Sequence, residues 1–268
     1  MPPGSSVPEG TQSLARAFAL LRRIAEAGPE GASLAELMAA EGLSRPTAYR
    51  LLQALRGQGF VRAAPRRGRY ALGYALFALG AQAGNAGGLR ELARPALLRL
   101  SARFGDSFFL LVPDGYAVLC LEVQDGEHPV RSYSHQVGGR IPMGVGQASL
   151  AILAHLGRAE RGEILRHNAE RLEREFGIEV TVVKGLLDSV RRLGFACGVP
   201  DRALPDYTGL AVPIVDPGGQ VLGAFSCALH RRRMTDARRE ALAQAMTDEA
   251  ARLVTRAGSL LRLEAHRA

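Results

Sequence analysis

A tight turn joins two short helical segments near the start of the chain, and this pairing strongly limits how the region can fold. Ser33 and Glu36 have the spacing of a capping box, so a short helix is predicted to begin there and to end at Gly42. Ser44 is placed to cap a second helix, and Pro46 fits in its first turn, where a missing N–H costs little. Two helices joined in this way predict a helix-turn-helix.

Further elements on both sides complete the unit. An amphipathic helix precedes it, with apolar residues spaced by four, three and four positions at Leu14, Phe18, Leu21 and Ala25. Two short stretches typical of β-strands follow it, at residues 60–62 and 69–72. We therefore predict that residues 11–72 form a winged helix-turn-helix domain, in which the hairpin is the wing.

The second helix of the motif has one apolar face and one polar face. Four side chains are expected to point into the core, namely Ala48, Leu51, Leu52 and Leu55. The opposite face then presents Arg45, Thr47, Tyr49 and Arg50. A helix displayed in this way fits the major groove of DNA, which is about 12 Å wide. We expect these four side chains to contact base edges.

Positive charge is concentrated around this motif. The 27 residues from Ser44 to Tyr70 hold seven arginines and no acidic residue, in a chain of net charge +8. Arg66, Arg67 and Arg69 lie on the predicted hairpin and are expected to contact DNA phosphates. The alternative is a solvated basic face without a ligand. Because the charge coincides with the helix-turn-helix pattern, the sequence favours double-stranded DNA as a partner.

The rest of the chain divides at a glycine-rich segment. Residues 1–10 are rich in Pro and Gly and predict a disordered tail, and residues 73–88 are expected to form a linker helix and a hinge. Residues 89–268 predict a second domain, which makes the chain α+β with a mainly antiparallel sheet. Its strands are expected at residues 107–112, 117–123, 130–134, 195–199, 208–215 and 220–228, with helices at 89–104, between 147 and 194, and from Thr235 onward.

Several classes of protein are excluded by what the sequence lacks. No apolar run approaches the roughly 18 residues of a membrane span, and the first residues do not have the pattern of a secretory signal, so we expect a cytoplasmic protein without a membrane partner. The three cysteines and six histidines do not have metal-ligand spacing, and no catalytic or phosphate-binding motif is present. We therefore expect no metal, no cofactor and no enzymatic activity. Arg231, Arg232 and Arg233 are expected to form a solvated loop.

Longer stretches resemble a known family of regulators. The runs SLARAFALLRRIAE and SLAELMAAEGLSRPTAYRLLQALRGQGFV, with the tyrosine of GRYALG, resemble the winged helix-turn-helix of the IclR family of bacterial transcriptional regulators. The runs VGGRIPMGVGQASLAILA, RRLGFACG and GLAVPIVDPGGQVLGAFS resemble that family's GAF-like effector-binding domain. The resemblance covers essentially the whole chain after the tail. It implies a homodimer or homotetramer that binds a pseudo-palindromic operator and responds to a small metabolite, commonly an organic or aromatic acid.

Glycines before a helix suggest where such an acid would bind. The segment from Pro142 to Gly146 precedes a helix, whose unpaired N–H groups and positive dipole end attract a carboxylate. From the residues alone, a tight turn without a ligand is an equal alternative. The resemblance favours the ligand, because in the family the backbone at the positions of Gln147 and Ala148 borders the effector. The candidate residues of this segment are Gly144, Gly146, Gln147 and Ala148.

The resemblance adds a second group of candidates from the predicted sheet. The positions that match the family's polar contacts are Asp201, Gly209, Ser226 and Ala228. Well-studied relatives that bind small keto acids have a cysteine and a second serine where this chain has Gly209 and Ala228. These replacements predict a roomier, more apolar pocket, which favours a larger acid such as an aromatic one. A buried structural role for Ser226 is the alternative.

The sequence thus predicts a DNA-binding transcriptional regulator whose operator affinity or activity is modulated by a small organic acid. Two alternatives stay open at this point. One is an enzyme that acts on small carboxylates and carries an accessory nucleic-acid-binding module. The other is a constitutive DNA-binding protein whose second domain serves only oligomerisation.

Overall fold

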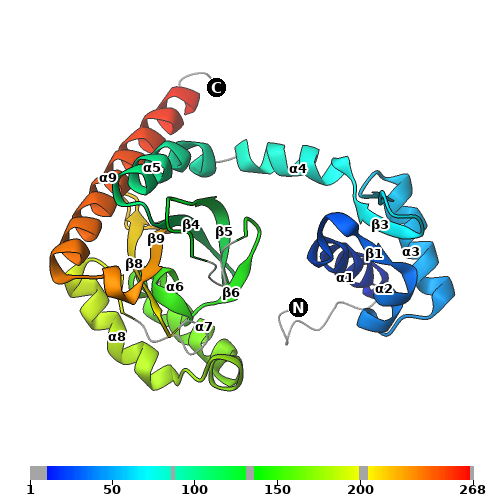
Figure 1. The fold of residues 1–268 in the computed structure, drawn as a ribbon, viewed down its shortest axis with the longest axis horizontal. Coiled ribbons are helices and arrows are strands. Elements are labelled where there is room, and N and C mark those ends of the chain that lie inside the picture. The colour runs from blue at the N-terminus through cyan, green and yellow to red at the C-terminus, as the bar shows by residue number, and fades with distance from the viewer. Residues whose placement is uncertain (1–10, 86–87, 131–135, 199–204, 266–268) are drawn as a thin grey trace. The chain divides into compact units, whose positions relative to one another are not determined.

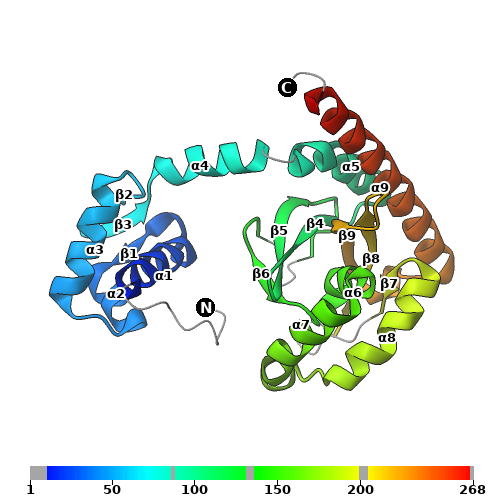
Figure 2. The same ribbon diagram turned by 180° about the vertical axis from the view of Figure 1, so that it is seen from behind.

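The computed structural model describes residues 11–85, 88–130, 136–198 and 205–265 (Figures 1 and 2). The chain separates into two compact units, Met1–Gly87 and Gly88–Ala268. The predicted tail at residues 1–10 lies outside the described residues, and so do residues 86–87 of the predicted hinge. Among the described residues, no helix is long and apolar enough to cross a membrane.

The first unit is a winged helix-turn-helix, as predicted. Its elements are α1 (Gln12–Glu26), the 3-10 turn η1 (Gly28–Glu30), β1 (Ala32–Ser33), α2 (Leu34–Glu41), α3 (Arg45–Gly57), β2 (Val61–Ala63), β3 (Arg69–Leu72) and α4 (Tyr74–Asn85). Strand β3 pairs antiparallel with both β1 and β2, so the hairpin is anchored in a three-stranded sheet. The short strand β1 was not predicted, because two residues carry no readable periodicity.

Local interactions explain how the two helices of the motif begin and end. The Ser33 backbone N–H donates to Glu36 Oε2 (2.8 Å), and the Glu36 N–H donates to Ser33 Oγ (3.3 Å), which is the predicted capping box. Gly42 ends α2 in the left-handed conformation that glycine adopts without strain. Ser44 precedes α3 as expected, but its hydroxyl contacts Thr47 Oγ1 (2.9 Å) and does not cap a backbone N–H.

The second unit is built on a six-stranded sheet covered on both faces by helices. The strand order is β6-β5-β4-β9-β8-β7, and all neighbouring strands in it are antiparallel. The strands are β4 (Ser107–Asp114), β5 (Ala117–Gln124), β6 (Arg140–Pro142), β7 (Ala196–Cys197), β8 (Tyr207–Val215) and β9 (Val221–His230). The helices are α5 (Leu89–Phe104), α6 (Gly146–His155), α7 (Arg158–Arg171), the π-helical turn η2 (Leu172–Phe176), α8 (Val180–Leu193), the 3-10 turn η3 (Arg231–Arg233) and α9 (Asp236–Ala265). The mainly antiparallel sheet expected from the sequence is confirmed.

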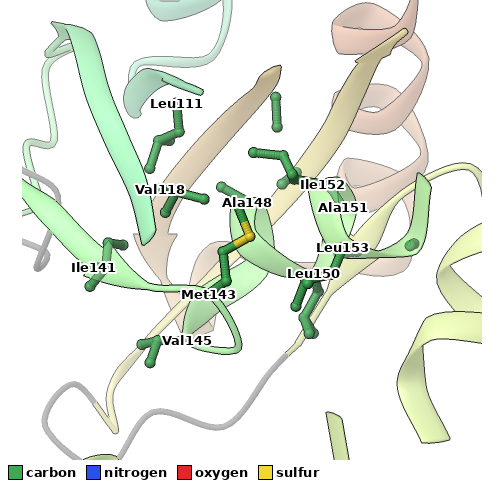
Figure 3. Packing of buried hydrophobic residues seen from close by; sticks show 14 of the residues in the cluster. Leu111, Val118, Ile141, Met143, Val145, Ala148, Leu150, Ala151, Ile152 and Leu153 are labelled. Atoms are coloured by element: carbon green, nitrogen blue, oxygen red, sulfur yellow. The ribbon is translucent and has the colours of Figure 1, made fainter. Parts of the chain in front are cut away.

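Two apolar cores lie on opposite faces of this sheet. On one face, α5 packs on β4 and β5 and α9 packs on β8, and the core between them also takes in Phe225, Cys227 and Leu229, which are alternate residues of β9. On the other face, α6 packs over β8 and β9, including Ala224 and Ala228 of β9, and α8 packs against α6. Helix α6 is buried on nearly every side, and Figure 3 shows its residues Ala148, Ala151 and Ile152 among apolar side chains of the sheet. The alternation of a β-strand therefore assigns each residue of β9 to one core or the other.

The structure of this unit differs from the prediction in three places. Pro113 and Asp114 belong to β4, so the turn to β5 comprises only Gly115 and Tyr116. Val130 is not in a strand, and residues 131–134 of the strand expected there lie outside the described residues. Strand β6, which pairs with β5, was not predicted, because a strand of three residues is too short for a pattern.

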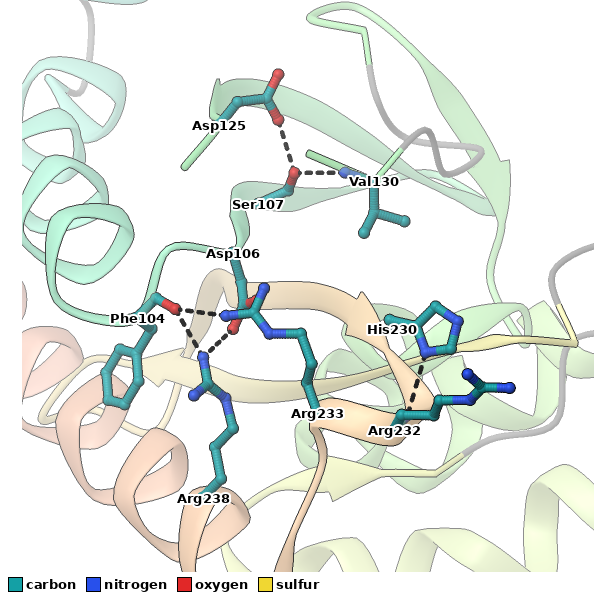
Figure 4. A network of polar contacts seen from close by, with 9 residues as sticks. All are labelled: Phe104, Asp106, Ser107, Asp125, Val130, His230, Arg232, Arg233 and Arg238. Atoms are coloured by element: carbon teal, nitrogen blue, oxygen red, sulfur yellow. Dashed lines mark hydrogen bonds and ion pairs between the residues drawn. The ribbon is translucent and has the colours of Figure 1, made fainter. Parts of the chain in front are cut away.

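A buried carboxylate connects the start of β4 with the end of β9 and with α9 (Figure 4). Asp106 is fully buried, and its two oxygens pair with Arg233 Nη1 and Arg238 Nη2, both at 2.8 Å. Both guanidinium groups also donate to the backbone oxygen of Phe104, at 3.2 and 2.6 Å. Arg233 is thus a structural residue, and the expectation that the whole Arg231–Arg233 segment is a solvated loop is wrong for this residue.

We expect Asp106→Asn to lower the free energy of unfolding by about 3 kcal/mol, because two guanidinium groups lose their buried counter-charge. Urea unfolding of the full chain followed by circular dichroism measures the effect. Glu170→Gln is the matched control, since the Glu170–Arg174 pair is 75–80% exposed and contributes at most about 1 kcal/mol. An equal loss in the two variants would show that the Asp106 pairs add no more than a surface ion pair.

Candidate functional site

Helix α3 presents a polar face to solvent in the first unit. Its inner face is fixed by Ala48 and Leu52, which are completely buried in the core of the unit. Arg45, Tyr49 and Arg50 are exposed, as predicted. Thr47 is half-buried, and its hydroxyl contacts Ser44 Oγ. The face opposite the core therefore offers guanidinium, phenol and hydroxyl groups together.

The wing continues this basic surface. Arg66 and Arg67 lie in the turn between β2 and β3 and are exposed. Arg62, on β2, donates from Nε to the Leu72 backbone oxygen (3.1 Å), so it supports the end of β3. Backbone geometry thus places two arginines at the tip of the hairpin, where phosphate contacts are typical of winged proteins.

The structure corrects the expectation for Arg69. Its Nε donates to the Gly31 backbone oxygen (2.9 Å), and its Nη2 donates to both carboxylate oxygens of Glu36 (2.8 and 3.1 Å). The same Glu36 forms the capping box with Ser33, and these hydrogen bonds hold the pKa of the carboxyl below its usual range. Arg69 thus attaches the wing to the start of α2 and is not free to contact a phosphate. Sequence spacing could not reveal this, because the pair is 33 residues apart.

In the second unit, the turn before α6 is held by α7. Asn168 is buried, and its Nδ2 donates to the backbone oxygens of Tyr116 (2.7 Å) and Met143 (2.9 Å). Gly144 has a φ of +116°, and a Cβ at this position would lie 2.6 Å from Leu172 Cδ1, so only glycine fits. The Gly144 N–H in turn donates to Ser149 Oγ within α6. Asn168 was not singled out in the sequence, since a lone asparagine in a helix gives no signal.

The first turn of α6 lies over the sheet. Gly146 opens the helix after Val145, which provides no side-chain cap. Gln147 extends toward β8, because its Oε1 would be 3.3 Å from a Cβ at Gly209. Ala148 is buried in the core below. The structure therefore brings the predicted residues Gln147 and Gly209 together.

The sheet beneath Gln147 has a floor of mostly small residues. Across β8, β9 and β4, one row of partners is Gly209, Ala228 and Ser107, and the next is Ala211, Ser226 and Phe109. Partners in antiparallel strands share a face, so these six residues all face α6. Gly209 is required by a close approach, because a Cβ there would lie 2.4 Å from the Cys227 backbone oxygen. We call this surface, with Gln147 above it, the α6 floor.

One polar side chain of the α6 floor makes no hydrogen bond within the part of the chain that the structure describes. Ser226 is 8% exposed, and its hydroxyl forms no hydrogen bond with the described part of the chain. The hydroxyl is therefore available as a donor or an acceptor on this sheet face. Asp201, the remaining predicted residue, lies outside the described residues.

The three cysteines are not reactive nucleophiles. Burial raises the pKa of the Cys120 and Cys227 thiols to about 12, and burial also raises the pKa of Cys197. Thiols with such pKa values are protonated at neutral pH and are poor nucleophiles. Among the residues that the structure describes, no three His, Cys, Asp or Glu side chains are grouped to hold a metal ion.

Helix-turn-helix and wing together define a DNA-binding protein of the kind that regulates transcription. The IclR helix-turn-helix domain matches residues 13–65, and the C-terminal domain of the bacterial transcriptional regulator IclR matches residues 82–255. The chain therefore belongs to the IclR family of transcriptional regulators. It is a regulator and not an enzyme, as the sequence predicted.

Similar curated proteins include repressors. The acetate operon repressor of Salmonella typhimurium (strain LT2) is 30% identical over 248 residues, which cover 91% of this chain and 89% of the repressor. Transcriptional repressor IclR of Escherichia coli (strain K12) is 29% identical over 230 residues, which cover 85% of this chain and 83% of that protein.

Solved structures share the fold. An IclR homologue from Microbacterium hydrocarbonoxydans, determined in complex with 4-hydroxybenzoate, superposes with a TM-score of 0.79 at 24% identity and covers 92% of this chain and 99% of its own. The IclR protein of Thermotoga maritima superposes with a TM-score of 0.70 at 23% identity, covering 92% and 98% of the two chains.

We expect Arg69→Ala to lower the thermal midpoint of the full chain at pH 7, because the wing loses its attachment to Glu36 and Gly31. The difference from the unchanged protein should narrow as the pH falls through the lowered pKa of Glu36, since the ion pair is lost there in the unchanged protein too. Circular dichroism melts between pH 7 and pH 3 provide the test. Arg67→Ala, at an exposed position, is the control and should leave the midpoint unchanged at every pH.

Asn168→Ala should destabilise the chain by about 1–3 kcal/mol, because one buried and one partly buried backbone oxygen lose the side-chain donor that the structure shows for them. Urea unfolding measures this loss. Asn168→Asp, which keeps the shape but brings a carboxylate against the same two oxygens, should cost at least as much. If Asn168→Asp proved neutral, the donor role of Asn168 would be wrong.

Proposed function

We propose that this chain is an operator-binding regulator whose DNA affinity or activity is modulated by a small organic acid bound on the α6 floor. The observation that carries the proposal is the approach of the first turn of α6 to β8, where Gln147 lies against Gly209, while the adjoining strand presents Ser226 on the same sheet face. The positive end of the α6 dipole and the free N–H groups of its first turn supply attraction for a carboxylate. A relative of the same fold was crystallised with 4-hydroxybenzoate, which supports an acid as the ligand class.

The size of the α6 floor favours an acid larger than a keto acid of two or three carbons. Gly209, Ala211 and Ala228 project little or no side chain toward α6, so this part of the sheet face is smaller and more apolar than a cysteine and a second serine would make it. Phe109, on the same face, provides an apolar edge. An aromatic acid is the best match to this combination of a polar end and an apolar floor.

For DNA, we propose that α3 enters the major groove and that the wing contacts the backbone. The base-contacting residues are Arg45, Thr47, Tyr49 and Arg50, and the phosphate contacts are Arg66 and Arg67. Exposure of Arg45, Tyr49 and Arg50 on one helix supports this assignment. Such a regulator acts on the chromosome, so we place the protein in the cytoplasm.

We further propose that the regulator is a homodimer or a homotetramer. Tyr74 and Phe77 on α4 are each 78% exposed, and Leu14 and Phe18 on α1 are more than half exposed. Exposed large apolar side chains, two on each of these helices, are typical of surfaces that bind another protein. A second copy of the chain would also place two copies of α3 on the two halves of a pseudo-palindromic operator.

The first experiment measures binding of the full chain to DNA that flanks its own gene, against a scrambled duplex of equal length. It is repeated with aliphatic and aromatic acids, including 4-hydroxybenzoate. We expect a preference for the flanking DNA that one class of acid changes. A site preference that no acid changes would instead favour the constitutive DNA-binding protein, and equal binding to both duplexes would contradict the operator assignment.

Arg50→Ala should reduce the preference for the operator over scrambled DNA by about tenfold or more, because a bidentate base contact discriminates by about 1–3 kcal/mol. Arg66→Ala should instead weaken binding to both duplexes and lower the slope of log K against log salt by about one. Fluorescence anisotropy at several salt concentrations distinguishes the two effects. An unchanged preference in Arg50→Ala, with an intact circular dichroism spectrum, would contradict the role of α3.

A further inference from the structure

The first turn of α4 is attached to the base of the wing by backbone contacts. The Gly73 N–H donates to the Phe60 backbone oxygen (2.8 Å), and the Ala75 N–H donates to the Gly59 oxygen (3.3 Å). A Cβ at Gly73 would collide with the same Gly59 oxygen, so this close approach requires glycine at position 73. The segment that enters β2 and the segment that leaves β3 therefore lie against each other.

The side chain of Arg62 adds a second attachment at the same place. Arg62 lies on β2, and its Nε donates to the backbone oxygen of Leu72, the last residue of β3 (3.1 Å). Its Nη1 donates to the Ala63 oxygen (3.3 Å), and its guanidinium carbon lies 5.6 Å from the centroid of the Tyr74 ring. Tyr74 is the first residue of α4. One side chain thus contacts the residues on both sides of Gly73.

Apolar side chains extend this attachment into the core of the first unit. Leu72 and Leu76 are partly buried and pack against the core that contains Ala48 and Leu52 of α3. A bend between β3 and α4 would separate these contacts and break the hydrogen bonds at Gly73. The start of α4 is therefore held to the wing and to α3 as one body.

We propose that Arg62 is a positioning residue for DNA binding, which fixes the wing to α4 and so sets the direction in which the wing tip meets the DNA backbone. It acts through Arg66 and Arg67 at the tip and not through a phosphate contact of its own. Because α4 leads along the chain toward the second unit, a change in the direction of α4 would turn the wing with it. The inference rests on the proposed operator binding.

Hydrogen exchange of the full chain tests the attachment without DNA. In Arg62→Ala, the amides of Gly73 and Ala75 should exchange at least about fivefold faster, because opening of the junction no longer breaks the Arg62 contacts. Tyr74→Ala, at a side chain that is 78% exposed, should act in the same direction, and Tyr74→Phe should not, because it keeps the ring. Arg22→Ala, at an exposed position of α1, is the matched control for the loss of one positive charge. Unchanged exchange in Arg62→Ala would overturn the attachment.

A double-mutant cycle tests whether Arg62 acts through the wing tip. Fluorescence anisotropy gives the affinity for the flanking DNA in Arg62→Ala, in the variant with Arg66→Ala and Arg67→Ala, and in their combination. Arg62→Ala alone should weaken binding about fivefold, and it should have less than about a twofold further effect once both tip arginines are replaced. A direct phosphate contact of Arg62 would instead weaken binding by the same factor in both backgrounds, which would overturn the positioning role.

Arg62→Lys separates the shape of the side chain from its charge. Lysine keeps the positive charge but lacks the planar group with several donors, so binding should fall as it does in Arg62→Ala. Circular dichroism verifies that each variant is folded. If lysine restored the affinity, charge alone would suffice at position 62 and the positioning role would be wrong.

The outcomes distinguish this inference from the proposed function. If the unchanged protein prefers the flanking DNA and the cycle is additive, the role of Arg62 is wrong and operator binding stands. If the unchanged protein binds flanking and scrambled DNA equally, operator binding and the positioning role are both overturned.

Discussion

The pairing of β9 with its two neighbours is the constraint on which the second unit depends. Strand β9 lies between β8 and β4, and its residues alternate between the core under α5 and α9 and the core under α6. A shift of one residue in this register would exchange the two faces, placing Phe225 and Cys227 under α6 and Ser226 in the opposite core. The candidate site therefore exists only in this register. The hairpin between β8 and β9, joined by a turn at Asp216–Gly219, fixes it locally.

Arginine, which makes up 33 of the 34 basic residues, has three separate roles in the fold. Arg233 and Arg238 neutralise a buried carboxylate and join segments that are far apart in the chain. Arg69 attaches the wing to the helix-turn-helix. Arg45 and Arg50 remain exposed on α3. A planar guanidinium with several donors suits all three tasks, so composition alone cannot separate the structural arginines from those available to DNA.

The sequence correctly predicts the helices and strands whose hydrophobic periodicity or turn residues extend over many positions. The capping box of α2, the helix Leu89–Phe104 and the β8–β9 hairpin all follow from periodicity and turn chemistry within about 20 residues. The contacts that were missed are those between distant residues. Both partners of Asp106 lie more than 120 residues away along the chain, and Arg69 and Glu36 belong to two elements that come together only in the folded unit. Periodicity assigns a face to a side chain but not a partner, so the exposed face of α3 could be predicted and the interactions of Arg69 and Asp106 could not.

Helix α6 is buried over seven consecutive residues, from Ala148 to Ala154. A helix enclosed on all sides cannot accept a larger or more polar side chain without disturbing the close packing around it. Gln147, in its first turn, is only partly buried and can vary without changing the core, whereas Gly146 and Gly209 are fixed by a positive φ and by a close approach of the backbone. Evolutionary change in the ligand that such a protein binds is then restricted to a few positions. A chain of this fold can therefore come to respond to a different ligand while its core stays the same.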